Sequence, residues 1–333
     1  MLKSLFRSIF DPLLSSPMAG RALASAVGRN GVIFFLHRFE CYEGQELGHR
    51  VEDLHRTLSA LRQSGVDILP IDEVVEIAVG LRERVHRRPF VAFSIDDCYW
   101  DFTEIALPVF REFEAPVTGF VCPGLIDTAD WFWWDKVDHL FANLDREVQI
   151  SVRNVQFTMA PTNSPVGFAR RGLLREFLKA LPNDERLLEI QRLSTVVEVP
   201  IPVEPPSQYR LSDWATLQKV ESDLVHLGAH TMSHPILRTC SDDVMKYEIA
   251  ESLRRVRETF RSPSRVFCYP NGTPSDFGAR EEEAVRACGA IGAISTVGGA
   301  VQPGSNVKRP YGIPRFAFGH DTALALRLAL FGR

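Results

Sequence analysis

The sequence predicts an α/β protein whose mainly parallel sheet closes, or nearly closes, into a barrel. Short apolar runs typical of buried strands recur along the chain, and most are followed by a helix-like pattern. These runs are GVIFFLH (31–37), PFVAFSID (89–96), APVTGFVCP (115–123), LVHLGAHT (224–231), RVFCYP (265–270), GAIGAIST (289–296) and YGIPRFAF (311–318). Strands that alternate with helices form parallel sheets, and about seven such units favour a barrel. In that architecture, functional side chains gather where the strands end.

Helix-like segments fill most gaps between these runs. Residues 49–65, 102–113 and 241–260 place apolar side chains at helical spacing. Ser241 stands at the start of the last segment, where its hydroxyl can cap the first turn. The predicted order of elements is therefore strand and helix in alternation over most of the chain.

Residues 124–210 interrupt this alternation. The segment opens with the aromatic-rich DWFWWDKVDHLFANL and ends with the Pro-rich VVEVPIPVEPPSQ, with helical patterns between them. We expect an insertion over one face of the barrel rather than an independent domain, because the segment is short of apolar strands. The predicted division is an N-terminal amphipathic helix and lead-in (1–30), a barrel domain (31–320) interrupted by the insertion (124–210), and a C-terminal tail (321–333).

Composition places the chain among ordinary globular enzymes. It has 333 residues, of which 45% are hydrophobic and 24% charged, and its formal net charge is −4. The slightly acidic balance argues against a nucleic-acid partner, which selects for basic surfaces. The six cysteines are scattered without a CxxC pair, so we expect free thiols and a reducing compartment. The oligomeric state cannot be inferred from these features.

The first 14 residues combine an apolar pattern with charges. Lys3, Arg7 and Asp11 interrupt the apolar run, so we expect neither an export signal nor a membrane span, and a cytoplasmic location. Leucine, isoleucine and phenylalanine still recur there at helical spacing. Two interpretations stay open: a helix docked on its own domain, or an interfacial helix that rests on a membrane.

Polar side chains follow the predicted strands at their carboxyl ends. These are His37, Asp96, Asp97, His230, His234, the YPNG segment (269–272) and Arg315. Two adjacent carboxylates raise each other's pKa unless a cation or hydrogen-bond donors separate them, although an Asp pair is also common in simple turns. Two imidazoles four residues apart, joined by one carboxylate, form a site with open positions for water and substrate. Zinc is the default ion for such a hydrolase, and the ligand types also suit other divalent metals.

Several of these segments resemble motifs of the polysaccharide deacetylase family, also called the NodB-homology domain. FSIDDCYWDFTEIALPVFREFEAPVTGFV resembles the first motif, in which a strand ends in Thr-Phe-Asp-Asp-Gly. LGAHTMSHPIL is similar to the second, His-Ser/Thr-x-x-His-Pro, and FCYPNG to the third. VIFFLHRF and IPRFAF resemble the opening Tyr-His-Arg strand and the closing Arg segment. The resemblance covers about residues 30–125 and 210–320, and it implies a distorted (β/α) barrel.

The resemblance also implies roles for individual residues. Asp97, His230 and His234 would bind the metal, and Asp96 would be the general base that takes a proton from the attacking water. Arg315 would orient Asp96. A backbone N–H at Tyr269 or its neighbourhood would stabilise the oxyanion. The expected substrate-binding residues are Pro270, Asn271, Trp100 and Trp214.

The general acid has two candidates. His37 ends the first strand and matches the Tyr-His-Arg segment that supplies the acid in some family members, so it is our choice. His320 follows the last strand and is the alternative. Two departures from the family pattern are Cys98, where the family has Gly, and Asn271, where it has an aromatic residue. Cys98 is interpreted as a packing thiol, with an additional metal ligand as the alternative.

The implied activity is metal-dependent removal of an N-acetyl group from an N-acetylhexosamine-containing glycan or glycolipid. Without an export signal, a cytoplasmic biosynthetic intermediate fits better than a finished wall polymer. A lipid-linked sugar at the inner membrane face would explain the apolar N-terminal helix and the aromatic WFWWD stretch. The alternative interpretation of WFWWD is packing within the insertion. Two further functions stay open: a hydrolase of formamides or cyclic ureides on the same fold, and a non-catalytic carbohydrate-binding relative.

Overall fold

A computed structural model describes residue 22 and residues 30–39, 48–86, 88–128, 130–142, 144–161 and 165–332. The predicted N-terminal amphipathic helix lies outside the described residues. No helix in the described part of the chain is long and apolar enough to cross a membrane.

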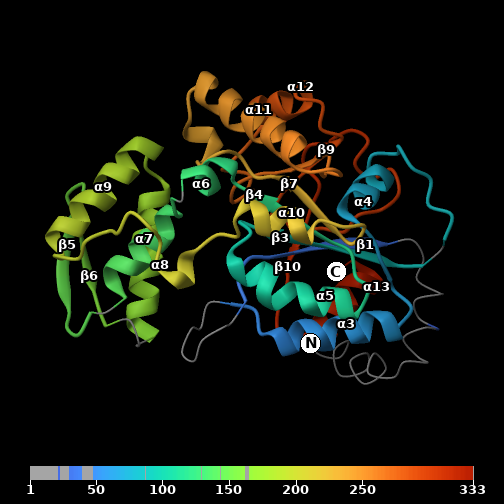
Figure 1. The fold of residues 1–333 in the computed structure, drawn as a ribbon, viewed down its shortest axis with the longest axis horizontal. Coiled ribbons are helices and arrows are strands. Elements are labelled where there is room, and N and C mark those ends of the chain that lie inside the picture. Colours follow the sequence, from blue (N-terminus) through green and yellow to red (C-terminus); the bar gives the residue numbers. More distant parts are fainter. Residues whose placement is uncertain are drawn as a thin grey trace, which may run out of the picture.

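A single large parallel sheet forms the centre of the molecule (Figure 1). Its strands follow the order β10-β1-β3-β4-β7-β8-β9, with the short β2 paired to β3. Their bounds are β1 (Gly31–Leu36), β2 (Asp67–Ile68), β3 (Phe90–Asp96), β4 (Val117–Val121), β7 (Val225–Ala229), β8 (Val266–Cys268), β9 (Gly292–Ile294) and β10 (Phe316–Ala317). All seven predicted apolar runs therefore contain a strand of this sheet.

The chain segment that leads into β10 lies between the two edges of the sheet. Ile313 forms a parallel bridge with Ile294 of β9, and Phe316 pairs with Phe34 of β1. The sheet is thus curled into a distorted barrel, and the predicted fold class is confirmed.

Helices cover the sheet and leave both of its faces buried. They are α3 (Val51–Gln63), α4 (Ile71–Ala78), α5 (Leu107–Glu112), α10 (Trp214–Val220), α11 (Asp242–Thr259), α12 (Ala279–Ala287) and α13 (Thr322–Phe331), with a π-helical turn (Phe102–Ala106) before α5. Every residue of β3 is buried, which explains its continuous apolar run. Alternate residues along it point to opposite faces: Phe93 and Ile95 join the larger hydrophobic cluster, whereas Ala92 joins a second one. Asp96 shares the face of Ala92.

Helix α11 shows how the local sequence sets an element next to the site. The Ser241 hydroxyl accepts a hydrogen bond from the Val244 N–H, as its N-cap position predicts. The apolar side chains of α11 recur every three or four residues and are buried in the larger cluster: Met245, Ile249, Leu253 and Val256. The helix therefore presents one fixed face to the barrel, and Glu248 is buried on that helix.

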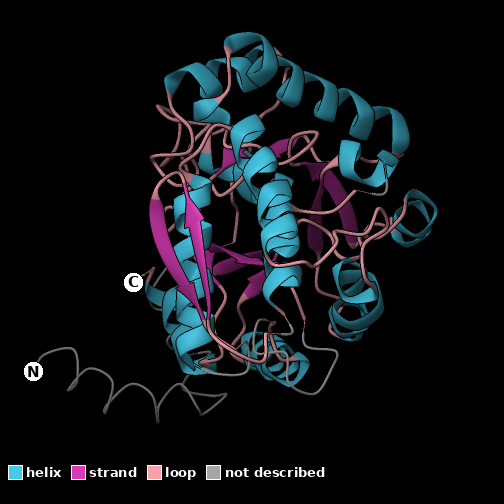
Figure 2. Ribbon diagram, turned by 90° about the vertical axis from the view of Figure 1, so that its left-hand side faces the viewer, coloured by secondary structure: helices cyan, strands magenta, loops and turns pink. Residues whose placement is uncertain are grey.

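The segment predicted as an insertion forms a lobe at the left of Figure 1. It contains α6 (Pro123–Thr128), α7 (Trp133–Phe141), α8 (Pro165–Lys179), α9 (Asn183–Val196), a 3-10 turn (Ser207–Tyr209) and the antiparallel pair β5 (Val148–Val152) and β6 (Val155–Met159). Figure 2, in which this side faces the viewer, shows the hairpin beside its helices. The lobe has a hydrophobic cluster of its own, in which Trp133, Phe141 and Leu174 take part. The division into domains remains a prediction, as does the tail at 321–333, most of which forms α13 here.

Candidate active site

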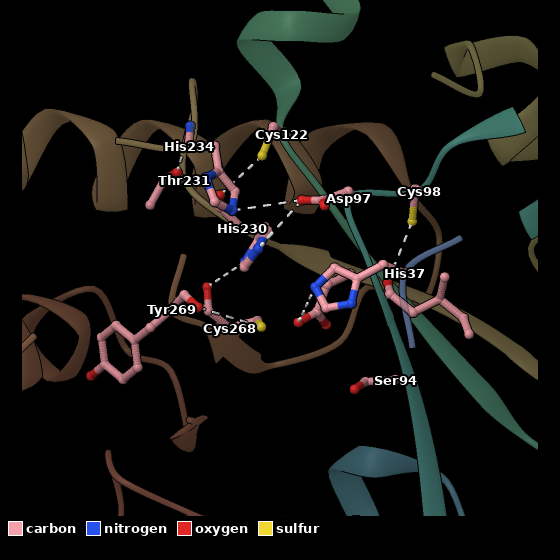
Figure 3. A network of polar contacts seen from close by, with 12 residues as sticks. His37, Ser94, Asp97, Cys98, Cys122, His230, Thr231, His234, Cys268 and Tyr269 are labelled. Atoms are coloured by element: carbon pink, nitrogen blue, oxygen red, sulfur yellow. Dashed lines mark hydrogen bonds and ion pairs between the residues drawn. The ribbon is translucent and has the colours of Figure 1, made fainter. Parts of the chain in front are cut away.

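Three predicted metal ligands meet at the carboxyl ends of neighbouring strands (Figure 3). Asp97 follows β3, and both histidines follow β7, which is separated from β3 only by β4. Asp97 Oδ1 lies 3.7 Å from His230 Nε2 and 3.6 Å from His234 Nε2. All three side chains are buried. The structure thus brings two imidazole nitrogens to one carboxylate oxygen.

Unusual backbone turns produce this convergence. Asp97, Thr231 and His234 have positive φ angles of 70°, 65° and 56°, a region that residues with a Cβ seldom adopt. Such turns persist only where the surrounding structure stabilises them, and they are common at functional sites. Asp97 directly follows β3, and Thr231 and His234 lie in the loop after β7, so these turns redirect the chain beyond the two strand ends.

The hydrogen bond of His230 determines which ring nitrogen faces Asp97. His230 Nδ1 lies 2.8 Å from the carbonyl oxygen of Cys268. Because a carbonyl only accepts, Nδ1 carries the hydrogen and Nε2 presents its lone pair to Asp97. Burial lowers the pKa of His230 to about 4 and that of His234 well below its ordinary value, so both rings are neutral at pH 7.

The same cluster fits a divalent cation. Burial, together with the nearby charge of Asp96, raises the pKa of Asp97 well above its usual range. Its Oδ1 atom is buried and has no hydrogen-bond partner among the described residues. A bound cation would satisfy this oxygen and favour the ionised carboxylate. Two neutral imidazoles and one carboxylate form a donor set suited to zinc and related ions.

Asp96 has the opposite environment. Its two oxygens accept hydrogen bonds from Arg315 Nη1 and Nη2 at 2.8 and 2.9 Å, and Nη1 also donates to Ser94 Oγ. Arg315 Nε donates to the Ser295 carbonyl, which fixes the guanidinium in place. Burial alone would raise the pKa of Asp96, but the charge of Arg315 lowers it well below its ordinary value. Asp96 is therefore held as a carboxylate in a buried position.

The two candidate acids lie in different surroundings. His37 Nε2 is 4.0 Å from Asp96 Oδ2, and the His37 side chain is 43% exposed. His320 is 64% exposed, and its Nδ1 lies 2.8 Å from Asp53 on α3. The structure thus brings His37, and not His320, next to Asp96.

In the segment after β8, the Tyr269 backbone N–H expected to stabilise an oxyanion already has a partner. The Tyr269 N–H already donates to the Ile294 carbonyl at 3.3 Å, and its ring stacks on Phe277. Pro270 has no N–H to offer. Asn271 has φ of 56°, and its side-chain Nδ2 is buried without a partner among the described residues. Two side-chain donors in this segment thus stay unused among the described residues: Asn271 Nδ2 and the Tyr269 hydroxyl.

The two predicted substrate-binding tryptophans lie in structural contacts. The backbone N–H of Trp100 donates to the Arg210 carbonyl, and Trp100 begins the helical turn that leads into α5. Trp214 Nε1 donates to Asp127, and its ring packs near Phe260. Neither of these two hydrogen bonds involves a predicted metal ligand.

A different aromatic group contacts the site. Trp134 lies edge-to-face against His234, with ring centres 4.6 Å apart, and Phe132 stacks on Trp134 at 4.4 Å. Trp134 Nε1 donates to the Tyr99 hydroxyl, which donates to Asp135 at 2.6 Å. Within the WFWWD stretch, Trp133 packs inside the insertion, as one interpretation expected, and Trp134 borders a predicted metal ligand. Sequence reasoning identified the stretch but not its contact with His234.

Arg38, next to His37, ties the two ends of the insertion to the barrel. Its guanidinium lies over the Tyr99 ring at 3.9 Å, donates to Asp101 at 2.8 Å and also donates to the Gln208 carbonyl. Asp135, in the first part of the insertion, bonds to Tyr99, and Gln208, near its end, bonds to Arg38, so both parts are held by this stacked pair of barrel residues.

Cys98 is a packing thiol. It is fully buried with φ of 50°, and its Sγ lies 3.8 Å from the Ile95 carbonyl. A Cβ added to Gly119 on β4 would lie 2.7 Å from this sulfur. Gly119 thus provides the space that a side chain larger than glycine needs at position 98. The second potential metal-binding group in the described residues combines Asp96 and His230 with Cys268 rather than Cys98.

Comparison with known proteins agrees with this fold. A family model described as polysaccharide deacetylase matches residues 187–289. No curated protein matches the sequence. Among solved structures, the deacetylase PplD of Streptococcus pyogenes, in complex with acetate, aligns with a TM-score of 0.56 and 13% identity over 88% of this chain and 94% of that one. IcaB from Ammonifex degensii aligns with a TM-score of 0.59 and 14% identity, over 91% and 98%.

A third structure, a de-N-acetylase from Aggregatibacter actinomycetemcomitans, aligns with a TM-score of 0.52 and 11% identity over 89% of this chain and 99% of that one. At such identities the structural similarity shows a shared barrel fold. The family match covers residues 187–289, within the same barrel that these structures share. The resemblance to the polysaccharide deacetylase family is confirmed.

Proposed function

We propose that the chain is a metal-dependent N-deacetylase that acts on an N-acetylhexosamine-containing glycan or glycolipid. The observation that carries this proposal is the pairing of two adjacent carboxylates with opposite environments. Asp97 faces two neutral imidazoles, whereas Asp96 is bound by Arg315. Such a division of roles is what hydrolysis of an amide needs: one group to hold a cation and one to accept a proton.

Asp97, His230 and His234 would hold the ion, with zinc as the expected metal. When bound, the ion supplies Lewis acidity toward the amide carbonyl and lowers the pKa of water. Asp96 accepts the proton of the attacking water, and its bidentate contact with Arg315 keeps it ionised and oriented. His37 donates a proton to the departing amine, which cannot leave as an anion. Its Nε2 lies 4.0 Å from Asp96, so the two proton-transfer groups face one reaction centre.

The remaining groups would orient the substrate. The unused Nδ2 donor of Asn271 is suited to an acyl or sugar oxygen. Trp134 and Phe132 offer an apolar border beside His234. We keep a lipid-linked sugar as the proposed substrate class, and a cytoplasmic location at the inner membrane face as a prediction from the sequence. Cell fractionation tests that location.

Metal content and acyl release test the function together. The purified protein is expected to contain about one equivalent of metal and to release acetate from N-acetylhexosamine oligosaccharides or their lipid-linked forms. His230→Ala and His234→Ala should lose both properties while the fold survives, and because both rings are buried, the circular dichroism spectrum of each variant checks the fold. His226→Ala, on β7 but away from the cluster, is the matched control.

Three outcomes contradict parts of the proposal. Unchanged metal content in both ligand variants would show that the site lies elsewhere. Release of formate or of a ring-opened ureide instead of acetate would favour the alternative hydrolases. A protein that binds glycan but has no bound metal and no hydrolytic activity would be the non-catalytic relative.

A further inference from the structure

The loop that carries His230 and His234 donates hydrogen bonds to one carboxylate on a neighbouring helix. Glu248, buried on α11, accepts hydrogen bonds through Oε2 from the Met232 and Ser233 backbone N–H groups at 2.8 and 2.9 Å. Its Oε1 accepts a third from the Ser233 hydroxyl at 2.6 Å. Glu248 therefore contacts two of the three residues between His230 and His234.

The loop needs such support because its conformation is strained. Thr231 and His234 lie on either side of the bound residues, and both have positive φ angles. Within the loop itself, the His234 N–H donates to Thr231 Oγ1 at 3.1 Å. The Met232 carbonyl also accepts a hydrogen bond from the Gly124 backbone N–H, which lies outside the loop, at 2.9 Å. Hydrogen bonds to an ionised acceptor are about twice as strong as neutral ones. The three bonds thus hold the backbone and the Ser233 side chain of the loop against the Glu248 carboxylate.

We propose that Glu248 is a positioning residue that fixes the spacing of His230 and His234 for a single cation. It touches neither histidine ring, and acts through the backbone of the residues between them. Side chains on the same face of helix α11 are buried in the hydrophobic core, so the position of the Glu248 carboxylate is fixed relative to the barrel. The proposal rests on the proposed metal site, and concerns the affinity of that site rather than the chemical step.

Metal affinity is the direct measurement. Competition with a chromophoric chelator gives the Kd for Zn²⁺, and the visible absorption of the Co²⁺-loaded protein reports coordination geometry. Glu248→Ala should bind Zn²⁺ about 10- to 100-fold more weakly, the usual effect of removing a group that orients a ligand. Its Co²⁺ spectrum should change as well. Glu248→Gln should fall between wild type and Glu248→Ala, because the amide oxygen still accepts the two N–H groups but without charge.

Two controls separate this role from general stability. Glu251→Gln removes a carboxylate from the same helix that pairs with Arg254 instead of the loop. Ser252→Ala removes a buried hydroxyl that bonds only within α11. Both should keep the wild-type Kd even if the melting temperature falls. If Glu248→Ala does not fold, Glu248→Gln and Ser233→Ala, which removes the third bond alone, must still weaken Zn²⁺ binding.

The possible results distinguish this inference from the proposed function. Wild-type Kd and spectrum in Glu248→Ala, or in both milder variants, would overturn the inference and leave the deacetylase proposal intact. Weaker Zn²⁺ binding in a protein that never releases acetate would support the role of Glu248 and overturn the proposed reaction. A wild type that binds neither ion would overturn both.

Discussion

Arg315 contacts Asp96 with both terminal nitrogens, and both residues are buried. A planar guanidinium can bind two carboxylate oxygens at once, whereas an ammonium group is a single point charge. The orientation of the proposed base therefore depends on a residue type and not only on a positive charge. Arg315 also spans from Asp96 to the Ser295 carbonyl, which connects β3 with the end of β9.

Arg315→Lys should retain metal but lower kcat by about 100-fold, a loss typical of a misplaced catalytic group. The lysine preserves charge and removes the two-point contact. Steady-state kinetics and metal analysis on the purified variant provide the check. Arg309→Lys, an exposed arginine paired with Glu282, is the control and should behave as wild type. An unchanged kcat in Arg315→Lys would mean that charge alone is sufficient.

Asp96→Asn and Asp97→Asn should differ in kind. Asp96→Asn is expected to keep its metal and to lose about 10²- to 10⁴-fold in kcat, since an amide cannot accept the proton of water. Asp97→Asn should lose metal affinity first. Metal titration followed by activity measurement on each variant distinguishes the two. Recovery of Asp96→Asn activity on addition of metal would show that we have exchanged the two roles.

The acid is identified by the alkaline limb of the pH–kcat profile. A group that donates a proton must be protonated beforehand, so activity falls as pH rises through its pKa. His37→Ala should retain metal and substrate binding but flatten this limb. His320→Ala, which loses its contacts with Asp53 and with the His49 ring, should keep it. The reverse result would transfer the assignment to His320.

Asp135 should make the protein less stable as the solution becomes more alkaline. Burial raises the pKa of Asp135 to about 7, although Arg38 and Tyr99 act in the opposite direction. An unfolded aspartate titrates near pH ~3.9, so between about pH 4 and 7 the folded state holds a proton that the unfolded state has released. The contribution of this bound proton to the free energy of unfolding is fully present below pH ~4. It falls by roughly 1.4 kcal/mol per pH unit as the pH rises to about 7.

Asp135→Asn cannot titrate, so the free energy of unfolding of the variant relative to wild type should rise over that pH range. Urea unfolding at several pH values measures this difference. Asp127→Asn, a partly exposed aspartate paired with Arg255, is the control. Parallel pH curves for wild type and Asp135→Asn would show that Asp135 is already ionised in the folded protein.

The sheet could be predicted because its strands are buried on both sides. Continuous apolar runs such as residues 90–96 therefore stand out in the sequence. β2 has only Asp67 and Ile68, too few residues to show a period. The hairpin β5–β6 was missed because most of its residues are partly or fully exposed, which leaves no apolar run.

The site could be predicted only as far as its side chains follow strands directly. Asp96, Asp97 and His230 leave the sheet at one edge, so parallel strands bring them together. Glu248 and Trp134 reach the same place from a helix and from the insertion, and nothing in their local sequence marks that approach. The same holds for Gly119, whose missing side chain matters because Cys98, Phe102 and Leu227 lie against it.

The contact between Asp96 and Arg315 joins residues 219 positions apart. On the ribosome, the strand that ends in Asp96 therefore emerges long before the arginine that will hold its carboxylate. Until then the barrel lacks the segment at 313–317 that lies between β9 and β1. Completion of the barrel and completion of the proposed catalytic pair are thus the same event, so a nascent chain that already has all the proposed metal ligands still lacks the proposed catalytic pair.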